Sequence, residues 1–121
     1  MIIAFATDNK NGLDSDISAH FGRAPYYIFV EVENGKVKNI IEKESPFSEG
    51  HSPGEVPMFV SKNKASVIIS GGMGQRAIEN FKNLGITPVV GVSGKVKDVL
   101  SDFLEGKLKD YKGNPCNEGC K

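Results

Sequence analysis

The stretch YYIFVEVENGKVKNII, residues 26–41, holds two apolar runs on either side of Asn34-Gly35. Asn-Gly is the dipeptide that most favours a two-residue type I′ turn, because both central residues of that turn have positive φ. The turn fixes the register of the flanking strands. The expected cross-strand pairs are Glu33 with Lys36, Val32 with Val37, Glu31 with Lys38 and Ile28 with Ile41. Opposite charges then share one face and most apolar pairs the other, so the stretch predicts an antiparallel β-hairpin.

Three further apolar runs lie outside the hairpin, at residues 2–6, 65–70 and 86–92. Short continuous runs of this kind, bounded by turn-forming residues, are typical of strands buried on both faces of a sheet. Pro88 lies within the last run, so we expect it near the start of its strand or on an exposed edge of the sheet.

Apolar residues at helical spacing predict three helices, one ending near residue 63, one across 77–84 and one across 96–104. Pro57 lies in the first turn of the first helix and favours a later start for it. The residues expected to begin or end these helices are Ser52, Pro53, Glu55, Gly85, Ser93 and Gly106.

The elements therefore follow one another as strand, hairpin of two strands, helix, strand, helix, strand, helix. Right-handed crossovers between the later strands give a mixed five-stranded sheet of order 3-2-1-4-5, in which the second strand is antiparallel. This is the ribonuclease H-like α/β topology. A flavodoxin-like sheet is the alternative, and it is disfavoured because the hairpin replaces its first crossover helix. We expect one domain over residues 1–108 and a flexible tail over 109–121.

Fifteen basic residues balance fifteen acidic ones, so no net charge attracts a polyanion and nucleic-acid binding is not expected. The apolar run at the N-terminus is too short for a signal peptide or a membrane span. With the two cysteines close together near the C-terminus rather than spread as a disulfide framework, we expect a cytoplasmic protein with no membrane partner.

One candidate site is the segment AHFGRAPYY, residues 19–27, which puts His20 and Arg23 just ahead of a strand. Imidazole can bind a metal or carry a proton near neutral pH, and a guanidinium group can hold an anion in a fixed fork. The alternative is structural: His20 forms local hydrogen bonds, Phe21 fills the core and Arg23 pairs with an aspartate.

A second candidate is SGGMGQRA, residues 70–77, at a turn from a strand into a helix. Gly71, Gly72 and Gly74 could present backbone N–H groups to an anion at the positive end of the helix dipole, and Arg76 could reach the same anion. The segment matches neither a Walker loop nor a full dinucleotide fingerprint. A tight turn that needs glycine for close packing is the alternative.

The remaining candidate metal ligands are His51, in a polar loop, and Cys116 and Cys120, which form a C-x3-C pair near the C-terminus. Thiolates and imidazoles are ligands for zinc, iron and iron–sulfur clusters. The cysteine spacing is less specific than that of paired C-x2-C motifs, so an incidental dithiol is the alternative.

Catalysis is the weaker hypothesis. A nuclease of this topology needs clustered carboxylates for two divalent ions. Asp8 ends the first strand suitably, but the fourth strand runs into Ser70-Gly71-Gly72 and supplies no carboxylate. Asp14 and Asp16 are expected to be solvated turn residues. We therefore do not expect an enzyme.

Four segments together resemble the dinitrogenase iron-molybdenum cofactor biosynthesis family: IIAFATD, HFGRAPYYIFVEVENG, VIISGGMGQRAIENFKNLGI and VVGVSGKVKDVL. The resemblance covers about residues 1–108, and its most specific elements are His20 to Arg23 and the glycine turn at 71–74. It implies a ribonuclease H-like fold and a protein that carries iron-molybdenum cofactor, or its iron–sulfur precursor, between assembly enzymes. It also implies that His20 binds an iron of the cluster while Arg23 and the glycine amides offset its negative charge.

The sequence thus leaves three hypotheses. The first is a non-catalytic carrier of a metal cofactor, with cofactor-assembly proteins as partners. The second is a phosphate- or nucleotide-binding protein, or a weak hydrolase, that uses the glycine turn with Arg23 or Arg76. The third is an interaction module that pairs with a partner strand along the exposed edge of the hairpin.

Overall fold

The computed structural model describes residues 1–45 and 55–105. Five strands form one sheet: β1 (Ile2–Thr7), β2 (Tyr26–Glu33), β3 (Lys36–Glu44), β4 (Val67–Ile69) and β5 (Thr87–Val89). The three helices are α1 (Glu55–Lys62), α2 (Gln75–Asn83) and α3 (Val96–Leu104), and two short 3₁₀ turns are η1 (Gly12–Asp14) and η2 (Phe21–Arg23). The sheet order is β3-β2-β1-β4-β5, with β2 antiparallel to β1 and with β4 and β5 parallel to β1 and each other. The predicted ribonuclease H-like topology is confirmed.

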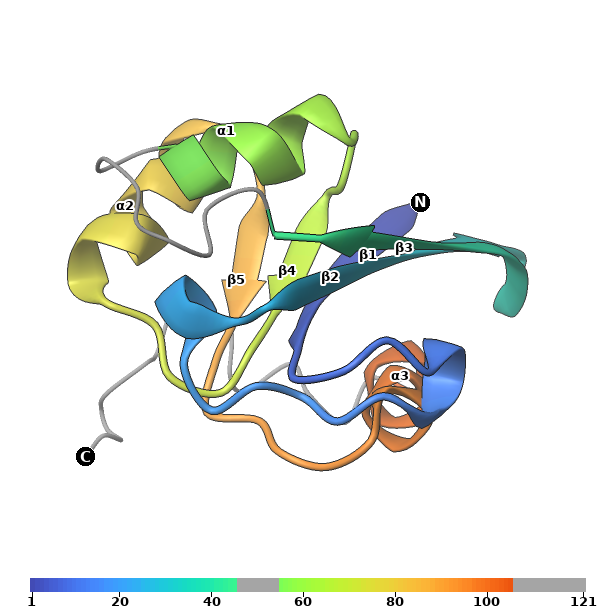
Figure 1. The fold of residues 1–121 in the computed structure, drawn as a ribbon. Coiled ribbons are helices and arrows are strands. Elements are labelled where there is room, and N and C mark those ends of the chain that lie inside the picture. Colours follow the sequence, from blue (N-terminus) through green and yellow to red (C-terminus); the bar gives the residue numbers. More distant parts are fainter. Residues whose placement is uncertain (46–54, 106–121) are drawn as a thin grey trace.

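The sheet is the middle of three layers, with α1 and α2 on one face and α3 on the other (Figure 1). The core beneath α1 and α2 includes Val60, Ile68 and Phe81, and the core beneath α3 includes Phe5, Ile69 and Val96. β1 is buried on both faces from Ile3 onward, as its continuous apolar sequence predicts. Within the described residues no helix is long and apolar enough to span a membrane.

The hairpin turn forms as predicted, with φ of 55° at Asn34 and 77° at Gly35. The first two predicted pairs, Glu33 with Lys36 and Val32 with Val37, are confirmed. The pairs Glu31 with Lys38 and Ile28 with Ile41 are wrong, because a register shift between Glu31 and Val32 leaves Lys38 without an opposite residue. Beyond this bulge Glu31 pairs with Asn39, Val30 with Ile40 and Phe29 with Ile41. The extra residue brings Ile40 onto the same face as Val30, where it packs against the core beneath α3.

The last two strands are shorter than the apolar runs that predict them, since regular pairing is limited to Val67–Ile69 and Thr87–Val89. Pro88 lies in the edge strand β5, as expected. Gly85 ends α2 with a positive φ of 78°. The predicted helix boundaries at Ser52, Pro53 and Gly106 lie outside the described residues.

Ser93 does not cap α3, because the N-cap residue is Lys95 and no side chain caps the helix. The Val96 N–H donates instead to the backbone carbonyl of Ser15, at 2.9 Å. Asp14 and Asp16 are also more than solvated turn residues: their carboxylates lie 3.0 Å from Lys97 Nζ and 2.9 Å from Lys95 Nζ. Residues 14–16 and the start of α3 are therefore held together by a backbone hydrogen bond and two ion pairs, although the two segments are far apart in the sequence.

Candidate functional site

Two loops meet at the carboxyl ends of β1 and β4. The loop after η1 crosses the end of β1, where the Ser18 N–H donates to the Ala6 carbonyl at 2.8 Å, and then reaches the end of β4. There His20 and Gly72 form a parallel bridge, and the Phe21 N–H donates to the Gly72 carbonyl at 2.8 Å. The sheet order places β1 and β4 side by side, so the segment around His20 and the glycine turn, 52 residues apart in the chain by their numbering (72 minus 20), become neighbours.

The contact between these loops is close enough to require glycine at two positions. A Cβ on Gly71 would lie 2.7 Å from the Ser18 carbonyl oxygen and 2.8 Å from the Ala19 Cα. A Cβ on Gly72 would lie 2.9 Å from the Ala19 carbonyl oxygen, whereas one on Gly74 would meet nothing within 4 Å. Close packing, the alternative explanation that the sequence left open, therefore accounts for glycine at positions 71 and 72.

The same contact uses the amides of these two glycines. The N–H groups of Gly71 and Gly72 donate to the carbonyls of Ser18 and Ala19. Further along the turn, the N–H groups from Met73 to Ala77 have no backbone acceptor among the described residues, and the first bond back into the turn is from Ile78 to Gly74, at 3.1 Å. The anion-binding amides would accordingly belong to Gly74 and the first residues of α2 rather than to Gly71 and Gly72.

His20 lies on the surface beside the glycine turn. Its backbone is fixed by Ser18, whose hydroxyl accepts from the His20 N–H at 3.3 Å and donates to the His20 carbonyl at 3.1 Å. Its Nδ1 lies 3.7 Å from the position of a Cβ on Gly72. Neither ring nitrogen hydrogen-bonds to any of the described residues, and the side chain is exposed. The imidazole is thus placed by its backbone and available to a ligand.

Both arginines of the chain lie on the two bridged segments, Arg23 three residues after His20 and Arg76 four residues after Gly72. The Arg23 N–H donates to the His20 carbonyl at 3.1 Å, which closes the 3₁₀ turn η2. Both arginines are exposed, and neither pairs with a carboxylate in residues 1–45 or 55–105. No described carboxylate therefore forms the structural ion pair with Arg23 that the sequence left open.

An aromatic cluster lies beneath these polar groups. The ring of Phe21 is buried between Tyr27 and Phe81, with ring centroids 5.9 Å and 5.3 Å away in edge-to-face arrangement. The Tyr27 hydroxyl donates to the Phe21 carbonyl at 3.1 Å, and burial raises the pKa of that hydroxyl. Sequence reasoning placed Phe21 in the core but missed Tyr27 as the anchor of η2; its place in an aromatic strand directly after the motif is the signal that could have indicated it.

The other three predicted metal ligands, His51, Cys116 and Cys120, lie outside the described residues. Among those that are described, no three histidine, cysteine, aspartate or glutamate side chains are close enough together to hold a metal ion. His20 is accordingly the one predicted metal ligand that lies within the described residues.

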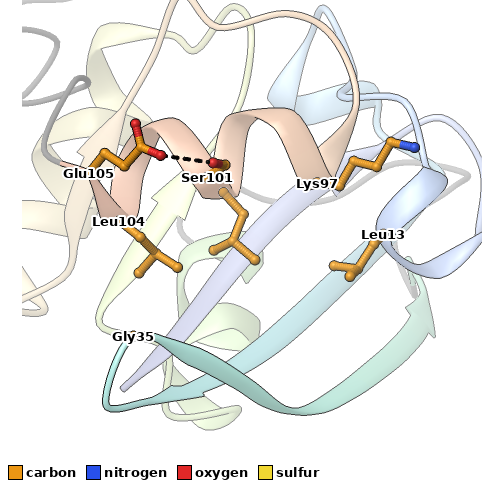
Figure 2. Close-up of a pocket in the computed structure, with 7 residues that line it drawn as sticks. Leu13, Gly35, Lys97, Ser101, Leu104 and Glu105 are labelled. Carbon is orange, nitrogen blue, oxygen red and sulfur yellow. Dashed lines mark hydrogen bonds between the residues drawn. The ribbon is translucent and has the colours of Figure 1, made fainter.

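A pocket of about 420 Å³ lies elsewhere, between α3 and the hairpin turn (Figure 2). The side chains of Leu13, Leu100 and Leu104 line it, with Gly35 on its far side. The antiparallel register puts the hairpin turn beside the start of β1, whereas His20 lies past its end. None of the predicted site residues lines this pocket.

Fold and site together define a class: a small ribonuclease H-like α/β protein with an exposed imidazole and two exposed guanidinium groups near the carboxyl ends of its central strands. The chain belongs to the dinitrogenase iron-molybdenum cofactor family, whose model matches residues 1–106. An uncharacterized protein of Methanocaldococcus jannaschii is 33% identical over 113 residues, which are 92% of each chain.

Two solved structures are similar to this chain in sequence and fold. The crystal structure of PH0822 is 41% identical, covers 89% of this chain and 94% of its own, and superposes with a TM-score of 0.81. An NMR structure of a Thermotoga protein, provisionally assigned as a NifB protein, is 26% identical, covers 88% of this chain and 89% of its own, and gives a TM-score of 0.67.

Proposed function

We propose that this protein is a non-catalytic carrier that binds an iron-molybdenum or iron–sulfur type cofactor, or a precursor of one, at the surface formed by His20, Arg23, Arg76 and the start of α2. The observation that carries the proposal is the bridge between His20 and Gly72. It brings an exposed imidazole and both arginines of the chain to adjoining segments. Membership of the dinitrogenase iron-molybdenum cofactor family supports this class of cargo.

The chemistry of these groups fits an anionic cluster. Imidazole nitrogen is a natural ligand for iron, and a guanidinium group is a permanent cation with several hydrogen-bond donors. The unpaired N–H groups at the start of α2 add donors and the positive end of a helix dipole. Cationic donors around a cluster lower the cost of holding its negative charge.

A site of this kind suits transfer rather than catalysis. The described site residues offer one metal ligand, so most coordination positions of a bound cluster would remain open to a donor or acceptor protein. The exposed position of His20 also leaves room for that protein to approach. Cofactor-assembly proteins in the cytoplasm are the partners that this function requires, and His51, Cys116 and Cys120 are candidates for further ligands.

Anaerobic reconstitution with iron and sulfide, with and without molybdate, tests the proposal. Iron, sulfide and molybdenum are counted per chain for wild type, His20→Ala and His51→Ala. We expect wild type to bind a cluster and His20→Ala to lose most of it, with an absorption spectrum altered for any cluster that stays. His51→Ala replaces the other histidine of the chain and should lose less. Equal metal content in wild type and His20→Ala contradicts the assignment of His20, and metal-free wild type contradicts the carrier function.

A second function, phosphate or nucleotide binding, is favoured by the unpaired amides at the start of α2 together with Arg76. A ligand at one hundred times its Kd stabilises a protein by about 2.7 kcal/mol, which a thermal-shift screen detects. If nucleotides or inorganic phosphate raise Tm, if Arg76→Gln removes the effect, and if no cluster binds, the second function replaces the first. Hydrolysis would follow only if product forms in the same samples.

A further inference from the structure

β3 is an edge strand of the sheet. It is the longest of the described strands, with nine residues, and it stands at one end of the sheet order. All of its residues are exposed except Ile40, which is half-buried. None of the described residues pairs with β3 on the side away from β2. An edge of this kind is a template for pairing with another strand, unless charge or irregularity opposes it.

The charges of β3 select the strand that could pair with it. Lys36 and Lys38 lie in its first half, and Glu42 and Glu44 lie in its last four residues. An antiparallel second copy of β3 brings the basic half of one strand against the acidic end of the other. A parallel copy brings like charges together, which is destabilising. The lysines that protect an edge against unrelated strands are therefore complementary to an antiparallel copy of the same strand.

The apolar residues of β3 support the same arrangement. Ile41 is 45% exposed, although it pairs with Phe29 on the face that α1 and α2 cover. The bulge at Lys38 leaves Asn39 to Glu44 as a regular stretch. With a two-fold axis at Ile41, the two Ile41 side chains would pack against each other, and the bulged Lys38 of each copy, just outside the regular stretch, would lie near Glu44 of the other.

The interactions that such pairing would replace are weak. The Ile40 N–H donates to the side-chain oxygen of the neighbouring Asn39, at 3.0 Å, and a carbonyl of the second strand could take its place. Lys38 Nζ lies 3.4 Å from a Glu33 carboxylate oxygen, but both side chains are more than half exposed, at 56% and 63%. Ion pairs this exposed contribute little to stability.

We propose that two copies of this protein associate through antiparallel pairing of β3 with β3, about a two-fold axis at Ile41, so that the two sheets become continuous. Because paired antiparallel strands run in opposite directions, the two His20 sites lie at opposite ends of the joined sheet and both stay accessible. The interface is small, so the association is weak and depends on concentration.

Sedimentation velocity of the full chain, from about 1 µM to about 1 mM, tests this pairing over the range of Kd expected for a small interface. We expect the mass to rise from the monomer value of 13.1 kDa toward twice that value. Ile41→Lys should keep the chain monomeric throughout. Leu84→Lys is the matched control, because Leu84 is similarly exposed, at 38%, but lies at the end of α2; it should associate as wild type does.

A charge exchange makes the test specific for the register. Lys38→Glu alone and Glu44→Lys alone each place like charges opposite each other twice per dimer, which should weaken association on the order of tenfold. An equimolar mixture of the two variants restores both opposite-charge pairs and should dimerise as well as wild type. Circular dichroism confirms that each variant is folded.

Three results would overturn the proposal. They are a wild-type chain that is monomeric at the highest concentration, an Ile41→Lys variant that dimerises normally, and a mixture of charge variants that associates no better than its components. The second result would direct attention to another surface, such as the leucine-lined pocket beneath α3.

Discussion

The two ends of β1 use glycine for opposite reasons. Past the end of β1, Gly71 has no positive φ, but the space for a side chain is filled by the backbone of Ser18 and Ala19. Beside the start of β1, Gly35 has open space within 4 Å and is required by its φ of 77°. Glycine is needed at position 71 because two distant segments are in contact there, and at position 35 because of the local backbone geometry. Substitutions at each end should therefore fail in different ways.

The largest effect is expected for Gly71→Ala. Its Cβ would lie within 2.9 Å of three backbone atoms, so either loop must move and the bonds between them must lengthen. We expect a loss of about 3 kcal/mol in the free energy of unfolding, in the range of overpacked sites. Gly74→Ala is the control, because its Cβ meets nothing within 4 Å, and it should cost less than about 1 kcal/mol. Urea denaturation of both variants measures the difference, and equal losses would show that crowding is not the reason for Gly71.

Tyr27→Phe should have the next largest effect. It removes the buried hydrogen bond to the Phe21 carbonyl, which should cost about 1.5 kcal/mol. Burial also raises the pKa of Tyr27 above its ordinary value of 10.0. The unfolded chain loses this proton first, so the stability that depends on it is complete below about pH 10 and is lost as the pH rises above that value.

Thermal unfolding between neutral pH and pH 11 tests this dependence. Wild type should lose stability above about pH 10, and Tyr27→Phe should lose less over the same interval. Tyr26→Phe is the matched control at the adjoining position, whose side chain is only half-buried. A Tyr27→Phe variant with the pH dependence of wild type would contradict the role given to burial.

Gly35→Ala should cost about 1 kcal/mol, because an L-residue at this φ is strained although nothing blocks its side chain. Gly35→Asn should recover much of the loss, since asparagine tolerates positive φ better than alanine does. At Gly71 the same asparagine should be worse than alanine, because it is larger. Urea denaturation should therefore rank the asparagine variant as more stable than the alanine variant at position 35, and as less stable at position 71. This reversal is the sharpest test of the difference between the two glycines.

The smallest effect is expected for Lys38→Ala in β3. Its ion pair with Glu33 is exposed to solvent, so the free energy of unfolding should change by less than about 0.5 kcal/mol, and less still in high salt. A loss above 1 kcal/mol, measured by urea denaturation at two salt concentrations, would mean that the bulge itself depends on this side chain.

The sequence predicted the fold wherever a local rule applies. Asn34-Gly35 indicated the hairpin, the apolar runs indicated the buried strands, and chain order with right-handed crossovers gave the sheet order. The bulge at Lys38 was not predictable from the turn, because it depends on the fit of Ile40 against the core. The predicted span of α3 is confirmed, but its Ser93 cap was wrong for a similar reason, since the Ser15 carbonyl that accepts from the Val96 N–H comes from a distant loop.

In the candidate site too, the residues themselves could be predicted from the sequence, but the contacts between distant segments could not. Sequence reasoning identified both loops, His20 and both arginines. It could not predict that the amides of Gly71 and Gly72 would be used in holding the loops together, because that requires knowing that the two segments touch. It also assigned no role to Tyr27.

The bridge at His20 and Gly72 also limits how this surface can change over evolutionary time. Mutation at Gly71 or Gly72 disturbs the chain path, so those positions offer little freedom for adaptation. Gly74, Gln75 and Arg76 are exposed, and new residues at these positions can alter charge and shape while the loops keep their course. Differences in binding between related proteins should accordingly be concentrated in that short exposed segment.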